Sequence, residues 1–109
     1  MDEQFKAFES WYLKKKCIWE QKGIFVESAG LSEFAHQYWI KVCSENGIGN
    51  IVLYESNGYY WVDFESGNYN LEENDVFCKS DITFETEDDL ITYEQEFIKH
   101  ITWQKTEKN

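Results

Sequence analysis

The dipeptide Asn57-Gly58 constrains the fold more than any other feature of the chain. Asn-Gly favours the positive φ angles that a tight hairpin turn requires. It lies between residues 50–55 and 59–65, two runs rich in β-branched and aromatic side chains. The pattern predicts an antiparallel β-hairpin at the centre of the chain.

Turn residues on both sides extend this hairpin into a meander. Asn46-Gly47 predicts a turn before it, and Ser66-Gly67-Asn68 predicts a turn after it. Residues 31–43 match a helical stripe, but 38–43 also match a strand rich in aromatic and β-branched residues. We favour a strand over 37–43, because turn residues and two stronger strands follow it. Further strands are expected over 24–26 and 76–85.

Amphipathic segments at the two ends of the chain predict helices. The first covers residues 2–21 and ends near Gly23; its apolar side chains are Phe5, Phe8, Trp11, Tyr12 and Trp19. The second begins at Thr86, an N-cap residue with Asp89 as its capping-box partner, and its apolar stripe is Leu90, Tyr93, Phe97 and Ile101. We therefore expect a single α+β domain over residues 1–109. It has an N-terminal helix, an antiparallel meander sheet of about four strands and a C-terminal helix, with both helices packed on one sheet face.

Aromatic residues give this short chain enough material for a core. The 109 residues are 18% aromatic, and each large ring buries much apolar surface. This composition argues against intrinsic disorder, although the chain is highly charged.

The charge is strongly and unevenly acidic. The net charge is −11, and all ten basic residues are lysines. Residues 55–96 contain thirteen acids and a single lysine, Lys79. Binding to nucleic acid phosphates or to anionic membranes needs basic patches, so we expect neither, and we expect a basic partner instead.

The chain shows no transmembrane or secretory pattern. No stretch approaches the roughly 20 apolar residues of a membrane span, and the acidic N-terminus does not resemble a signal peptide. The three cysteines, Cys17, Cys43 and Cys78, are odd in number and widely spaced. They indicate a reducing, cytoplasmic setting with buried thiols.

Strand alternation places acids and aromatic rings on one sheet face. In the 59–65 strand, Tyr59, Trp61, Asp63 and Glu65 point away from the expected core. In the 76–85 strand, the same alternation directs Val76, Cys78, Ile82 and Phe84 inward and Phe77, Lys79, Asp81 and Glu85 outward. Adding the acidic loop after 59–65, the candidate partner-binding residues are Tyr59, Trp61, Asp63, Glu65, Glu72, Glu73, Asp75, Asp81 and Glu85. The alternative is that these acids are only solvated surface residues.

Catalytic and metal-binding patterns are weak. There is no His-x-x-x-His, Cys-x-x-Cys, phosphate-binding glycine loop or EF-hand loop. A nucleophilic pair of His36 and Cys43 has no local support, and His100 fits a surface residue near a helix C-terminus. We expect no catalytic residue, no metal and no cofactor, and hence a binding protein rather than an enzyme.

Residues 36–102 resemble the immunity proteins of bacterial polymorphic-toxin and contact-dependent growth inhibition systems. The resemblance lies in the runs YWIKVC (38–43), ENGIGNIVLYE (45–55), GYYWVDFE (58–65) and EFIKHI (96–101). It implies a cytoplasmic protein that binds and neutralises the C-terminal toxin domain of a cognate effector. Many such toxins are nucleases with basic clefts, which an acidic inhibitor can fill.

Two other classes of function remain open. One is an acidic nucleic-acid mimic that antagonises a DNA- or RNA-binding protein, since it too needs a negative surface. The other is a small enzyme or sugar-binding module that uses Trp61 and Tyr59 for stacking.

Overall fold

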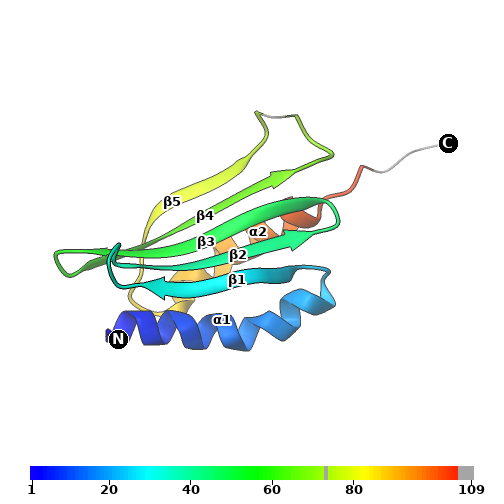
Figure 1. Ribbon diagram of the computed structural model, residues 1–109. Coiled ribbons are helices and arrows are strands. Elements are labelled where there is room, and N and C mark those ends of the chain that lie inside the picture. The colour runs from blue at the N-terminus through cyan, green and yellow to red at the C-terminus, as the bar shows by residue number, and fades with distance from the viewer. Residues whose placement is uncertain (73, 106–109) are drawn as a thin grey trace.

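A helix, five strands and a second helix follow one another along the chain (Figure 1). The structure is a computed structural model and describes residues 1–72 and 74–105. A short 3-10 turn, η1, directly precedes the second helix. The elements are α1 (Glu3–Gln21), β1 (Phe25–Ser32), β2 (Gln37–Ser44), β3 (Gly47–Ser56), β4 (Tyr59–Asn68), β5 (Phe77–Thr83), η1 (Glu87–Leu90) and α2 (Ile91–Thr102).

The five strands form one antiparallel sheet in the order β1-β2-β3-β4-β5. The predicted central hairpin is confirmed: Asn57 and Gly58 connect β3 to β4 with φ angles of 53° and 81°. The strand assignment of residues 37–43 is also confirmed. The sheet has five strands, close to the expected number of about four, and the short strand expected at 24–26 is longer, Phe25–Ser32.

Both helices pack on the same face of the sheet, as the amphipathic patterns predicted (Figure 1). Phe8 of α1 contacts Tyr38 of β2 edge to face, with ring centroids 5.7 Å apart. Phe64 of β4 contacts Trp11 of α1 at 6.5 Å and Phe97 of α2 at 5.6 Å. Aromatic rings therefore join the two helices to the sheet in one core.

A buried carboxylate fastens the two helices to each other. Glu94 of α2 is only 5% exposed. It accepts a hydrogen bond from the Trp19 indole N–H at 2.9 Å and lies 3.3 Å from the Lys15 ammonium, both on α1. A buried carboxylate needs such partners, because loss of hydration is costly.

The turn predicted at Ser66-Gly67-Asn68 is wrong, because β4 continues through Asn68. Gly67 and Asn68 pair with Ile48 and Gly47 of β3. The Asn68 side chain is buried and donates to the carbonyl oxygens of His100 and Trp103, at 2.8 and 2.9 Å. This side chain caps the C-terminal end of α2, which explains why a turn-forming residue lies inside a strand.

The alternation predicted for the first half of β5 is also wrong. An irregularity in the pairing with β4 lies between Val62 and Phe64, and Asp81 has a φ of 58°. The extra residue of this β-bulge reverses the direction of the preceding side chains. Phe77 and Lys79 therefore lie on the helical side of the sheet and Cys78 on the opposite side, whereas Ile82 and Phe84 point inward as predicted.

The cysteines are not buried, contrary to the expectation from their spacing. Cys17 and Cys78 are exposed and Cys43 is half-buried, and all three are free thiols. Burial and the neighbouring Glu27 carboxylate raise the pKa of the Cys43 thiol. Among the residues that the structure describes, no helix is long and apolar enough to cross a membrane.

Candidate functional site

The sheet face opposite the helices, here called the open face, carries the residues that alternation selected on β4. Tyr59, Trp61, Asp63 and Glu65 all lie on it, since the intervening Val62 and Phe64 are fully buried beneath the helices. Cross-strand pairing places Tyr54 beside Trp61 and Val52 beside Asp63. The face is therefore a continuous surface built by several strands.

Three rings on the open face form an aromatic ladder, Tyr54, Trp61 and Tyr59. Trp61 stacks with Tyr54 and with Tyr59, and its ring centroid lies 5.4 Å from each, with interplanar angles of 17° and 22°. The Tyr59 hydroxyl lies 2.9 Å from the Thr83 hydroxyl of β5. These contacts hold the rings in place before any partner arrives, so little side-chain entropy remains to be lost on binding.

Carboxylates lie directly beside this ladder. Burial raises the pKa of the Tyr54 hydroxyl, and the negative charges of Asp63 and Glu65 raise it further. Tyr54 is half-buried, Asp63 is half-buried and Glu65 is exposed. The open face thus combines aromatic side chains that a partner can bury with negative charges beside them. Protein interfaces often have this composition, with aromatic residues at the centre and charged residues around them.

Asp63 also has a structural task. Its Oδ1 accepts a hydrogen bond of 2.9 Å from the backbone N–H of Asp81, the residue with positive φ in the β5 bulge. One oxygen of Asp63 is therefore committed to the sheet. Glu65 makes no such bond among the described residues and is the freer of the two carboxylates.

The remaining candidate residues divide into two groups. Glu72 and Asp75 are exposed in the loop between β4 and β5, and both line a cavity at the edge of the open face. Glu73 lies outside the described residues. Glu85 follows the end of β5, and its backbone N–H donates to Asp89 Oδ2 at 2.8 Å, so it belongs to the start of η1 rather than to the open face.

A row of mainly apolar residues crosses the open face at the end away from the aromatic ladder. Pairing aligns Phe25, Cys43, Ile48 and Gly67 on four adjacent strands. Phe25 and Ile48 are 53% and 48% exposed. The open face therefore has two apolar regions, and a more polar row with Lys41, Asn50 and Glu65 separates them.

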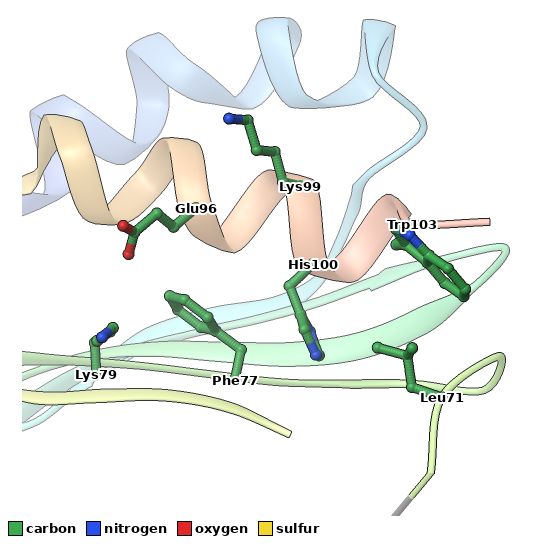
Figure 2. A pocket seen from close by; sticks show the side chains of 7 residues that line it. All are labelled: Leu71, Phe77, Lys79, Glu96, Lys99, His100 and Trp103. Carbon is green, nitrogen blue, oxygen red and sulfur yellow. The ribbon is translucent and has the colours of Figure 1, made fainter. Parts of the chain in front are cut away.

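Another cavity lies between α2 and β5 on the helical side of the sheet (Figure 2). Its volume is about 480 Å³. Figure 2 shows Phe77 and His100 beneath α2, Leu71 and Trp103 facing each other at one end, and Lys99 pointing away from the sheet. This groove exists because α2 lies mainly over β4, which leaves the inner side of β5 partly uncovered.

His100 in this groove is held by two hydrogen bonds. Its Nε2 lies 2.7 Å from the carbonyl oxygen of Asp75, and its Nδ1 lies 2.7 Å from the Ser66 hydroxyl. A carbonyl oxygen can only accept, so Nε2 donates to Asp75, and Nδ1 pairs with the Ser66 hydroxyl. These two hydrogen bonds tie α2 to β4 and to the loop, and the Ser66 hydroxyl is buried, since Ser66 is only 3% exposed.

The His36 and Cys43 side chains do not meet. His36 lies in the turn before β2, 3.5 Å from the Glu55 carboxylate, whereas Cys43 lies near the other end of β2. In the described part of the chain, no group of three or more His, Cys, Asp or Glu residues is placed to hold a metal ion.

Comparison of the chain with protein-family models, with curated proteins and with solved structures gives no match.

Sequence reasoning missed part of the open face. It did not select Trp39, Val52 or Tyr54, although the alternation that identified the β4 residues applies equally to β2 and β3. It also took Gly67 as a turn residue, because nothing local distinguishes a glycine in a turn from a glycine that leaves space on a strand.

Proposed function

We propose that this chain is a cytoplasmic immunity protein that binds and neutralises the toxic domain of a cognate bacterial effector, of the nuclease type, through its open face. The observation that carries the proposal is the aromatic ladder flanked by Asp63 and Glu65 on the sheet face that neither helix covers. Rigid aromatic anchors supply binding energy once they are desolvated.

The charge pattern favours a basic partner. Acids dominate β4 and the following loop, whereas four of the lysines lie on α1, behind the sheet. A negative surface of this kind steers a positively charged cleft and raises its association rate. Nuclease active sites are basic because they hold phosphates, so carboxylates on this face would take the positions of substrate phosphates.

The direct test is calorimetry of this protein against the C-terminal toxin domain encoded immediately upstream, combined with an assay of toxin activity. We expect one-to-one binding and loss of toxin activity on mixing. An absence of binding at micromolar concentrations would remove this pair from consideration. A basic nucleic-acid-binding protein captured in its place would favour the acidic-mimic function.

A charge reversal on the open face tests which surface is used. Glu65→Lys should slow association about threefold to tenfold and flatten its salt dependence, because it removes a steering charge near the anchors. Glu20→Lys changes the net charge equally on exposed α1 and is the matched control. Equal association rates for the two variants would exclude the open face. Asp63 is tested as Asp63→Asn, which preserves the acceptor for Asp81.

A further inference from the structure

Gly67 is the one glycine of the chain with no structural reason to be glycine. Among the other five, Gly23 and Gly58 have positive φ angles, and Gly30, Gly47 and Gly49 lie against atoms that leave no room for a Cβ. Gly67 has neither property, since an added Cβ would meet no atom within 4 Å. Glycine inside a strand is destabilising and frequently marks a place that another molecule approaches closely.

The missing side chain leaves a hollow on the open face. Ser66 and Asn68 point inward and are buried, so a side chain at position 67 would point outward. Two adjoining cavities of about 260 Å³ each meet at Gly67, and both are lined by Ile48, Gly67 and Val76. Ile48 and Val76 are 48% and 58% exposed, so the walls of this Gly67 hollow are apolar and accessible.

The ends of the hollow are negatively charged. Glu65 lines one cavity, and Glu72 and Asp75 line the other, together with Tyr69, which is 69% exposed. No lysine or histidine is among the described residues that line either cavity. An apolar wall with carboxylates at its ends matches a side chain that has an aliphatic stem and a cationic head. The Tyr69 ring adds a surface that attracts cations.

We infer that the Gly67 hollow receives one long cationic side chain, an arginine or a lysine, from the basic protein that the open face binds. The stem lies between Ile48 and Val76, and the head group reaches Glu65 or the pair Glu72 and Asp75. This inference rests on the proposed function and specifies how the partner is recognised. A side chain inserted into the hollow would fix the position of the partner on the sheet.

Filling the hollow tests the inference on the full chain. The series Gly67→Ala, Gly67→Val and Gly67→Ile places growing side chains in open space on a strand that suits β-branched residues. We expect the melting temperature to stay unchanged or to rise, because glycine is the least favourable residue here. Affinity for the toxin domain should fall with side-chain size, by about tenfold or more at isoleucine. Ser28→Thr is the control and should bind normally, because it adds a methyl group at an exposed position of β1 on the same face and keeps the hydroxyl that accepts from Trp39.

A titration with short peptides tests the hollow without the toxin. The probes are acetyl-Gly-Arg-Gly-amide, acetyl-Gly-Lys-Gly-amide and the neutral norleucine analogue, followed by amide resonances in NMR spectra. We expect one or both cationic peptides to shift Ile48, Gly67 and Val76 saturably, and Gly67→Val to abolish these shifts. The arginine and lysine arms show which head group is preferred. Equal shifts from norleucine, shifts that persist in Gly67→Val, or no shifts at these residues would overturn the inference.

The two experiments separate the hollow from the proposed function. Peptide binding at Gly67 without toxin binding would leave the hollow standing and remove the proposed partner. Toxin binding that is unaffected by Gly67→Ile, with no peptide response, would retain the immunity function and reject the hollow.

Discussion

At the residue scale, Glu94 shows how one buried polar group determines the packing of two helices. It is the acceptor for the Trp19 indole N–H and the partner of Lys15. Glu94→Ala should lower the free energy of unfolding by about 1–3 kcal/mol, because it leaves the Trp19 N–H without an acceptor in the core. Urea denaturation followed by tryptophan fluorescence measures this change.

Glu94→Gln separates the hydrogen bond from the ion pair. The amide oxygen still accepts from Trp19. The variant loses the Lys15 ion pair, but it also removes the cost of burying a charge, and the two effects offset each other. This variant should remain within about 1 kcal/mol of the original protein. If Glu94→Ala proved as stable as Glu94→Gln, the hydrogen bond would not be what joins the helices.

Single residues also show where sequence reasoning reached its limit. The buried aromatic face of α1 was predicted residue by residue, because helical periodicity is a local property. The roles of Asn68 and His100 were not predictable, because each depends on partners about 30 residues away along the chain. The role of Gly67 was not predictable either, because it depends on the empty space beside this residue in the folded sheet.

At the element scale, strands were predicted where their own residues favour them and were missed where the neighbouring strand imposes them. Residues 28–30 of β1, Ser-Ala-Gly, have low β-propensity, yet they pair with β2. The Trp39 ring lies over Gly30 and occupies the place that a side chain there would fill. The reversed alternation in β5 has a similar origin, because the bulge at Asp81 depends on the Asp63 carboxylate of β4.

The start of η1 and α2 gives a prediction about acid stability. The backbone N–H groups of Thr86 and Glu85 donate to Asp89 Oδ2 at 3.0 and 2.8 Å, and these bonds lower the pKa of the Asp89 carboxyl. A lowered pKa in the folded state means that the ionised form stabilises the fold. This contribution is complete above the ordinary Asp pKa of 3.8, decreases as the pH falls below that value and is lost below the lowered pKa.

Asp89→Asn keeps an acceptor for the same N–H groups but does not titrate. The variant should be less stable than the original protein at neutral pH, and the difference should narrow as the pH falls through the acidic range. Urea midpoints measured from neutral pH down to about pH 3 test this expectation. A constant difference between the two proteins at every pH would contradict the role assigned to the carboxylate.

At the scale of the whole molecule, the meander places consecutive strands side by side, so that segments close in the sequence are also neighbours in the sheet. Twelve of the thirteen acids of residues 55–96 lie in the part of the chain that the structure describes, and they follow one another from the end of β3 to α2. Few attractions offset them: the described residues form three ion pairs between lysine and glutamate, and among these three only Lys15–Glu94 involves a buried carboxylate. The fold thus holds like charges together on one flank, at a cost in stability.

Salt should consequently stabilise the free protein and weaken its complex. Raising NaCl from about 20 mM to about 500 mM shortens the screening length and reduces the mutual repulsion of the acids, so the melting temperature should rise by about 3–5 °C. The double variant Glu72→Gln with Glu85→Gln removes two exposed charges of this flank. It should melt higher than the original protein at low salt and show a smaller salt response, whereas association with a basic partner should slow with salt in both proteins. A melting temperature that falls with salt would mean that attractive pairs outweigh the repulsion, and the clustered acids would then need no partner to balance them.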